Sequence, residues 1–179
     1  MSANISRSNF EGVFFDLDGT LADTAPDLAA AANKLRLDRN LDPIPFELLR
    51  PAASAGARGL LAVAFGITPE DKNFIELRDE FLNNYENALH VHSYLFDGVE
   101  ELLSKLEQQN VPWGIVTNKI ERFTNPFVKS IGLDKSAIAV VSGDTTPTPK
   151  PHPAPILLAS SIAKVLPENS LYVNIIHPL

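Results

Sequence analysis

The feature that most constrains this chain is a short apolar run that ends in acidic residues. Residues 12–15 read Gly-Val-Phe-Phe, and Asp16 and Asp18 follow directly. An apolar run without alternation is typical of a strand that is buried on both faces, as in a parallel sheet. Because open parallel sheets bind ligands beyond the carboxyl ends of their strands, we expect a functional site immediately after residue 15.

Three further strands are predicted downstream, and polar residues follow the first two of them. The strands are expected at residues 113–117, 138–141 and 171–173, and helices at about 97–106, 123–131 and 153–164. Asp97 is predicted to cap the first of these helices, with Glu100 completing a capping box. Alternating strands and helices indicate parallel βαβ units with right-handed crossovers. The expected fold class is therefore α/β, a Rossmann-like parallel sheet with helices on both faces.

The middle of the chain is expected to be wholly helical. An alanine-rich helix is predicted to run to about Leu37, with Asp23 or Thr24 as its N-cap. Across residues 46–94, apolar residues recur at three- and four-residue steps, and no strand is predicted. We interpret this block as a cap inserted into the α/β core. The expected boundaries are 1–21 and 96–179 for the core and 22–95 for the helical cap.

The two aspartates after the first strand carry the clearest chemical signal. If the strand geometry continues through them, the Asp16 and Asp18 carboxylates project to one side while Leu17 points away. Such a pair can hold a hard cation such as Mg²⁺, and it can divide the roles of nucleophile and general acid or base. Gly19 permits a tight turn beside a ligand. The alternative interpretation is an ordinary turn or helix-capping pair.

Polar groups after the later strands can join this pair. Thr117 and Asn118 offer a hydroxyl and an amide to phosphate oxygens, and Lys150 offers a positive point charge. Lys119 follows directly and either faces the same pocket or turns away from it. In the predicted cap, Arg58 could reach a carboxylate or sugar of a substrate, or it could be a solvated helix residue.

Other candidate residues have simpler interpretations. Asp144 follows the third strand and either lines the site or caps a turn. His90 and His92 have the spacing of a short metal pair, but a helix end is favoured because no third ligand lies nearby. His152 is expected to have a structural role in its proline-rich loop.

Three of these segments together resemble a known family. The first motif reads Phe-Asp-Leu-Asp-Gly-Thr-Leu over residues 15–21, the second is Thr117-Asn118, and the third is the Lys-Pro-His-Pro of residues 150–153. Their order, spacing and strand positions resemble those of the haloacid dehalogenase-like phosphatases. The resemblance covers about residues 13–173, and the helical block corresponds to the small cap of that family.

Within this superfamily, the chain resembles the phosphoglycolate phosphatases. Residues 54–60, 113–119 and 141–144 are most similar to the branch that dephosphorylates N-acetylmuramic acid 6-phosphate during peptidoglycan recycling. The resemblance therefore implies a small phosphorylated metabolite as the substrate and Mg²⁺ as the cofactor.

The resemblance also implies a role for each motif residue. Asp16 is expected to be the nucleophile that forms an aspartyl-phosphate, and Asp18 the acid that protonates the leaving alcohol and then activates water. The Asp16 carboxylate and the Asp18 main-chain carbonyl are expected to hold Mg²⁺. Thr117 and Lys150 are expected to hold the transferring phosphoryl group, with Asn118 nearby. Apart from the resemblance, Lys119 and Arg58 are candidate ligands of the substrate.

The fourth motif of the family is the point of departure. It follows the fourth strand as Gly-Asp with another acid a few positions later, whereas no acidic residue follows Glu168 in this chain. Asn174 and His177 are interpreted as an ordinary tail. We therefore expect a C-terminally truncated or frameshifted member that holds Mg²⁺ weakly and has weak or no phosphatase activity. An exposed sheet edge would favour a homodimer or aggregation.

Composition excludes several partner classes. The chain has 15 Lys and Arg against 22 Asp and Glu, a net charge of −7, and no cysteine. An acidic chain lacks the basic field that binds nucleic acids or anionic membranes. The absence of cysteine excludes thiolate nucleophiles and Cys-type zinc sites and fits a reducing compartment. No apolar run is long enough to span a bilayer, so a cytoplasmic protein is expected.

Two other functions remain open from the sequence. A phospho-receiver signalling domain also gathers acids, Thr and Lys at strand ends, but its acceptor Asp would follow the third strand and it would lack a long helical insertion. A non-catalytic remnant that binds a phosphorylated ligand is the second alternative, which the absent fourth motif favours. A P-loop enzyme is disfavoured because no G-x-x-x-x-G-K-[ST] motif is present.

Overall fold

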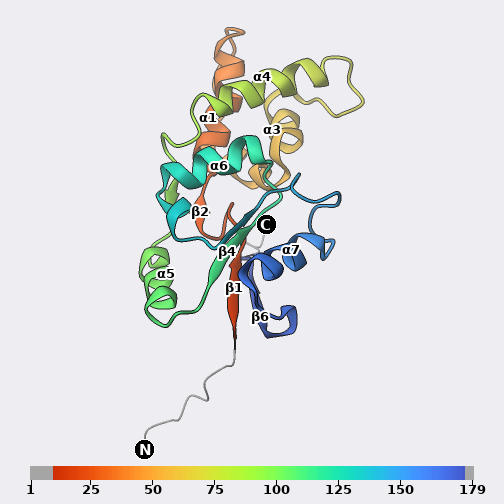
Figure 1. The fold of residues 1–179 in the computed structure, drawn as a ribbon. Helices are drawn as coiled ribbons and strands as arrows, with labels where there is room; N and C mark the ends of the chain where they lie inside the picture. The colour runs from red at the N-terminus through yellow and green to blue at the C-terminus, as the bar shows by residue number, and fades with distance from the viewer. Residues whose placement is uncertain (1–9, 176–179) are drawn as a thin grey trace, which may run out of the picture.

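The computed structural model describes residues 10–175, which form a parallel sheet with a layer of helices beyond one end of its strands (Figure 1). The sheet has the strand order β5-β4-β1-β6, and all its neighbouring strands are parallel. Its strands are β1 (Gly12–Phe15), β4 (Trp113–Val116), β5 (Ala139–Val141) and β6 (Ser170–Val173). The four strands predicted from the sequence are therefore confirmed. Ile176 to Leu179 and the prediction for His177 lie outside the described residues.

The strand register brings the ends of β1, β4 and β6 level with one another. Phe15 of β1 is paired with Ile115 on one side and with Val173 on the other. Every residue of β1 and β4 is buried, as their apolar composition predicts. The polar residues that follow these strands therefore emerge at one edge of the sheet.

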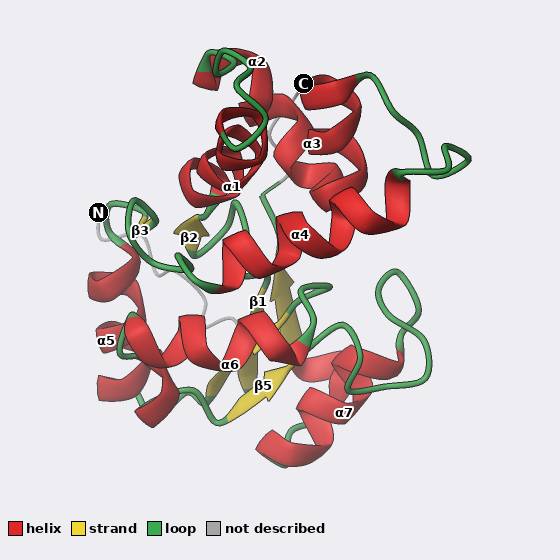
Figure 2. Ribbon diagram, turned by 90° about the horizontal axis from the view of Figure 1, so that it is seen from above, coloured by secondary structure: helices red, strands yellow, loops and turns green. Residues whose placement is uncertain are grey.

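Helices cover both faces of this sheet, as predicted (Figure 2). The helices α5 (Val99–Gln108) and α6 (Glu121–Ser130) share a buried cluster with Phe15 and Trp113. The helix α7 (Ala154–Ala163) packs in a second cluster with Phe14 and Val116. Because successive side chains of a strand point to opposite faces, the neighbours Phe14 and Phe15 belong to different clusters.

The helical layer has a core of its own. It consists of α1 (Ala25–Leu37), α2 (Phe46–Leu49), a 3₁₀ segment (Arg50–Ala55), α3 (Gly56–Phe65) and α4 (Phe74–Glu86). The apolar stripes predicted on α3 and α4 are buried in one shared cluster, which includes Leu60, Leu61, Phe81 and Tyr85. A separate core supports an inserted cap, whose exact boundaries stay a prediction.

The predicted absence of strands between residues 46 and 94 is wrong at its end. Two short strands, β2 (Ala22–Asp23) and β3 (Tyr94–Leu95), pair antiparallel where the chain passes between the sheet and the helical layer. Continuous helix is also wrong, because Gly66 ends α3 in a left-handed conformation and a loop precedes α4. Strands of two residues are too short for a periodic sequence signal.

The predicted capping box of α5 is also wrong. The N-cap residue is Gly98, which has φ of 82°, and no side chain caps the helix. Thr24 does occupy the N-cap position of α1, but its hydroxyl donates to Asp18 and accepts no hydrogen bond from the helix backbone. No helix within residues 10–175 has the length and apolar character needed to cross a bilayer.

Candidate active site

Asp16 and Asp18 lie in a tight turn at the carboxyl end of β1. The Asp16 N–H donates to the Val173 carbonyl at 2.9 Å, which continues the pairing of β1 with β6 by one residue. Leu17 is fully buried, and its carbonyl accepts hydrogen bonds from Leu21 and Ala22. The buried Leu17 side chain separates two partly exposed aspartates, which agrees with the predicted alternation.

Gly19 has the role in this turn that the sequence predicts. Its φ is +77°, in the region that only glycine adopts without strain. Its N–H donates to the Ala22 carbonyl at 2.8 Å, and the Ala22 N–H donates to Leu17 at 3.0 Å. This turn leads the chain from Asp18 directly into β2 and the helical layer.

Lys150 pairs with Asp16. Its Nζ lies 2.9 Å from Asp16 Oδ1, and the two side chains are only 12% and 16% exposed. The same Nζ donates to the Val116 carbonyl at 2.9 Å and contacts the Tyr172 hydroxyl. Burial, and then the negative charge of Asp16, raise the pKa of Tyr172 well above its ordinary value. The ends of β4 and β6 thus fix the ammonium beside the first aspartate.

Lys119 pairs with Asp18. Its Nζ lies 2.8 Å from Asp18 Oδ1, and Thr24 Oγ1 donates to the same oxygen at 2.5 Å. The Lys119 side chain is only 6% exposed and lies near the rings of Tyr85 and Phe127. Burial lowers the pKa of Lys119, but the interactions with Asp18 and Tyr85 together outweigh it, and the net pKa is raised above the ordinary value.

Asn118 joins the second motif to the third. Its Nδ2 donates to the Lys150 carbonyl at 3.0 Å, and its Oδ1 accepts from the Lys150 N–H at 2.9 Å. The loop after β5 packs against the same segment, because the Gly143 N–H donates to the Lys119 carbonyl at 2.8 Å. Asn118 therefore holds the loop that carries Lys150.

Thr117 is buried at the end of β4. Its N–H donates to the Val141 carbonyl at 3.0 Å, and its hydroxyl accepts from the Lys119 N–H at 3.1 Å. Among the described residues, none accepts the hydroxyl proton of Thr117, so this proton is available to a bound oxyanion.

The structure does not bring every candidate to this site. Arg58 is exposed on α3, and its side chain has no ion pair or hydrogen bond with another described residue. Asp144 Oδ1 accepts from the Glu121 N–H at 2.8 Å and so binds the N-terminus of α6. His90 packs edge-on against Phe127, which agrees with the structural interpretation of this histidine. The structural role expected of His152 is also met, since its Nδ1 accepts from the Ala154 N–H at 3.2 Å.

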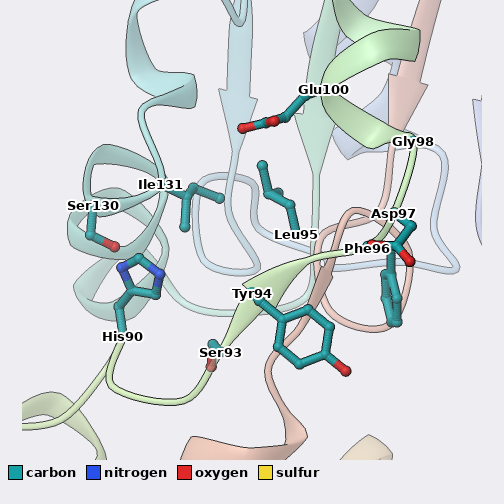
Figure 3. A pocket seen from close by; sticks show the side chains of 10 residues that line it. All are labelled: His90, Ser93, Tyr94, Leu95, Phe96, Asp97, Gly98, Glu100, Ser130 and Ile131. Atoms are coloured by element: carbon teal, nitrogen blue, oxygen red, sulfur yellow. The ribbon is translucent and has the colours of Figure 1, made fainter.

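A cavity of about 500 Å³ lies apart from these pairs. It is formed by β3, the start of α5 and the end of α6, with His90, Tyr94 and Glu100 among the side chains around it (Figure 3). None of the four paired residues, Asp16, Asp18, Lys119 and Lys150, lines it. The geometry of the strand ends, and not the size of this cavity, therefore identifies the candidate active site.

The donor set determines what cation the site could hold. Within residues 10–175, no group of three His, Cys, Asp or Glu could hold a metal ion. The two oxygens expected to bind Mg²⁺, Asp16 Oδ2 and the Asp18 main-chain carbonyl, nevertheless have no partner among the described residues. Mg²⁺ is commonly held by one or two carboxylates together with substrate phosphate and water. The residues present fit such a shared site and do not form an all-protein cage.

The charges of the site also favour a cation when a phosphate is bound. Two aspartates face two lysines in the ion pairs Asp16–Lys150 and Asp18–Lys119, so their formal charges cancel. A phosphate monoester would add negative charge to this neutral cluster. A divalent cation would compensate this added charge.

Two residues of this arrangement were not predicted as site residues from the sequence. Tyr172 reaches Lys150 from inside β6, and Thr24 reaches Asp18 from the start of α1. Tyr172 lies near the end of a predicted strand, and this position could have indicated a site residue. Thr24 was interpreted only as a helix cap, because nothing local indicates that its hydroxyl turns back to Asp18.

Comparisons with known proteins agree with this geometry. The family model described as haloacid dehalogenase-like hydrolase matches residues 13–174. An N-acetylmuramic acid 6-phosphate phosphatase from Pseudomonas putida is 40% identical over 162 residues, which are 90% of this chain and 73% of that protein. A phosphoglycolate phosphatase from Xanthomonas campestris pv. campestris is 42% identical over 162 residues, with the same two shares.

Solved structures show the same fold. The crystal structure of a predicted phosphoglycolate phosphatase from Haemophilus somnus 129PT matches with a TM-score of 0.78 and 28% identity, covering 93% of this chain and 77% of that one. A HAD-superfamily hydrolase from Geobacter sulfurreducens matches with a TM-score of 0.77 and 21% identity, covering 97% and 81%, and supports the fold alone. The chain therefore belongs to the haloacid dehalogenase-like hydrolases.

Proposed function

We propose that this protein hydrolyses a small phosphate monoester through a phosphorylated Asp16. The observation that carries this proposal is the Asp16–Lys150 pair at the carboxyl end of β1, with Asp18 two residues further on. Paired carboxylates can act separately as nucleophile and as general acid or base. The similarity to phosphatases of this family supports the same assignment.

The first half of the reaction transfers the phosphoryl group to Asp16. A carboxylate oxygen of Asp16 attacks phosphorus while the bond between phosphorus and the alcohol oxygen breaks, and Asp18 in its protonated form gives a proton to that oxygen. In the second half, Asp18 takes a proton from water, the water oxygen attacks phosphorus, and the bond to Asp16 breaks. Inorganic phosphate leaves, and both aspartates return to their starting states.

Lys150 and Thr117 stabilise the charge that develops on the phosphoryl oxygens. Lys150 is fixed by Asp16 and the Val116 carbonyl, so it needs little reorganisation when the phosphate arrives. The Thr117 hydroxyl supplies a neutral donor. When bound by Asp16 and the Asp18 carbonyl, Mg²⁺ would reduce the repulsion between the Asp16 carboxylate and the phosphate. Because one carboxylate and one main-chain carbonyl are the ligands expected within residues 10–175, we propose that cation binding is weak and turnover slow.

The proposed substrates are phosphoglycolate and N-acetylmuramic acid 6-phosphate, after the relatives named above. Both molecules carry a carboxylate in addition to the phosphate. Arg58 supports this choice, because it is an exposed guanidinium on the helical layer without an ion-pair partner among the described residues. We propose that Arg58 binds this second anionic group.

Phosphate release from these two substrates, measured with and without Mg²⁺, tests this proposal. We expect slow release that requires millimolar Mg²⁺ and is lost in Asp16→Asn. Equal release by the wild type and by Asp16→Asn would refute the assignment.

The non-catalytic alternative keeps one supporting observation, the absence of a third acidic ligand in the described part of the chain. It predicts that inorganic phosphate binds while neither substrate is hydrolysed. The phospho-receiver alternative needs Asp144 as its acceptor, but that carboxylate binds the Glu121 N–H. The cytoplasmic location and the homodimer stay predictions.

A further inference from the structure

The strongest unassigned feature of the molecule is the buried ammonium of Lys119. Its side chain is 6% exposed, and three separate elements meet around it. Asp18 reaches it from the turn after β1 at 2.8 Å, Tyr85 from α4 with its ring centroid at 4.9 Å, and Phe127 from α6 at 5.9 Å. The carboxylate and the two aromatic rings therefore hold this buried ammonium in a fixed position.

This environment differs from that of a phosphate ligand. The Lys150 ammonium faces Asp16, the residue that the proposed function makes the nucleophile. The Lys119 ammonium faces Asp18, and aromatic rings cover it. The carboxylate that Lys119 holds also accepts from Thr24, so two donors converge on Asp18 Oδ1. Two convergent donors restrict the rotation of this carboxylate and leave Oδ2 as the oxygen that can serve the leaving group.

We propose that Lys119 is a positioning residue, which holds the Asp18 carboxylate in line for proton transfer, and that Tyr85 of α4 holds Lys119 in turn. This inference rests on the proposed function, because it assigns Asp18 the proton transfer. It differs from the alternative in which Lys119 is a ligand of the substrate. It also gives the helical layer a part in the reaction, because Tyr85 of α4 contacts Lys119.

The contacts of α4 with the segment after β4 support this link. Next to Tyr85, Asn83 and Glu86 both accept hydrogen bonds from Arg122 of α6. The Tyr85 hydroxyl is buried and has no hydrogen-bond partner among the described residues. Burying an unpartnered hydroxyl is unfavourable, so packing of the ring against Lys119 and Phe123 must compensate for it.

The test separates kcat from KM in Lys119→Met, which keeps the length of the side chain and removes its charge. We expect kcat to fall about 10- to 100-fold, because general acid–base catalysis supplies at least that factor and depends on geometry. KM and the Kd of inorganic phosphate should stay within about twofold, because no phosphate contact is lost. Lys119→Arg, which keeps a cation beside Asp18, should recover part of the lost kcat. Lys105→Met is the control, since Lys105 is exposed on α5.

A second pair of variants tests the part of Tyr85. Tyr85→Leu removes the ring over Lys119 and should lower kcat about 2- to 10-fold with KM unchanged, as expected for a partly desolvated cation–π contact. Phe74→Leu removes a buried ring at the start of the same helix, away from Tyr85. It should lower the melting temperature similarly but leave kcat unaffected.

The outcomes distinguish this inference from the proposed function. If Lys119→Met raises KM and the Kd of phosphate at least tenfold while kcat is unchanged, Lys119 is a phosphate ligand and the inference is wrong. If Tyr85→Leu and Phe74→Leu affect kcat equally, Tyr85 has no specific part. Failure of Asp16→Asn to abolish turnover would instead overturn the proposed function itself. Phosphate binding gives a readout for Lys119 that does not depend on turnover.

Discussion

Asn118 and Lys150 are 32 residues apart in the chain and form two hydrogen bonds with each other. Both bonds join the side-chain amide of Asn118 to the backbone of Lys150. The Asn118 Nδ2 donates to the Lys150 carbonyl, and its Oδ1 accepts from the Lys150 N–H. Both functional groups of the amide are therefore used to hold a loop. Asn118 therefore affects the proposed reaction indirectly, because it fixes the loop that carries Lys150.

This pairing makes Asn118→Ala a specific prediction. The variant should lower kcat about tenfold, because small displacements of a positioned group cost rate steeply. It should destabilise the fold by only about 1–2 kcal/mol, since two exposed hydrogen bonds are lost. Steady-state kinetics and urea unfolding measure both effects. Asn125→Ala, which removes an exposed amide bonded to Glu121 on α6, should change neither kcat nor stability appreciably.

Gly143 is predicted to be essential for the same loop. A Cβ at this position would lie 2.2 Å from the Asn118 carbonyl oxygen, so Gly143→Ala must displace backbone. We expect a loss of about 1–3 kcal/mol, typical of overpacking, together with reduced activity. At Gly12, by contrast, the nearest atom to an added Cβ is the Val165 side chain at 3.1 Å. Thermal unfolding should show Gly12→Ala to be the milder change, and the reverse order would contradict the close packing of Gly143 against Asn118.

Asp27 should be a major determinant of stability. Its side chain is on α1, is 1% exposed, and accepts hydrogen bonds from the N–H groups of residues 91, 92 and 93 and from the Ser93 hydroxyl. Asp27→Ala leaves these donors without their acceptor and should cost about 3 kcal/mol or more. Asp38→Ala, at an exposed pair with Lys34, should cost less than about 1 kcal/mol. Similar unfolding free energies for the two variants would be incompatible with this role.

The ion pair between Arg39 of α1 and Glu80 of α4 predicts a weak pH dependence. A hydrogen bond from Arg39 lowers the pKa of Glu80 below its ordinary value. A carboxyl with a lowered pKa stabilises the fold above its ordinary pKa and loses that contribution as the pH falls through the folded-state pKa. Because both side chains are about one third exposed, the contribution should not exceed about 1 kcal/mol.

Unfolding free energies of the wild type and Glu80→Gln at neutral and acidic pH measure this contribution. The difference between the two proteins should be small at neutral pH and vanish in acid. A difference that grows on acidification would show that the Glu80 carboxylate does not stabilise the fold.

Much of the fold could be predicted because its signals are local. The unbroken apolar run of β1 predicts a buried strand, and the aspartates after it mark the carboxyl end of a parallel sheet. The stripes of α3 and α4 predicted their buried faces for the same reason. By contrast, the pairing of Ala22 with Leu95 joins segments that are distant in sequence and too short to have a period.

The candidate site also contains residues that the local sequence predicts and residues that it does not. Asp16, Asp18, Thr117 and Lys150 could be identified because each follows or lies near a strand end. The direction of a long side chain could not be predicted, so it stayed open whether Lys119 faces the pocket, and in the structure it lies against Asp18 under Tyr85. That position depends on packing between α4, α6 and the turn after β1, which no local sequence pattern contains.

The central claim is that Asp16 accepts the phosphoryl group. It is tested most directly by incubating the protein with N-acetylmuramic acid 6-phosphate and Mg²⁺, quenching in acid, and mapping phosphorylated peptides by mass spectrometry. Slow turnover does not prevent this measurement, because it reads the covalent step itself. We predict phosphate on Asp16 that hydroxylamine removes and that is absent from Asp16→Asn. Substrate hydrolysis without any phosphorylated Asp16, or with the label on another residue, would contradict the claim.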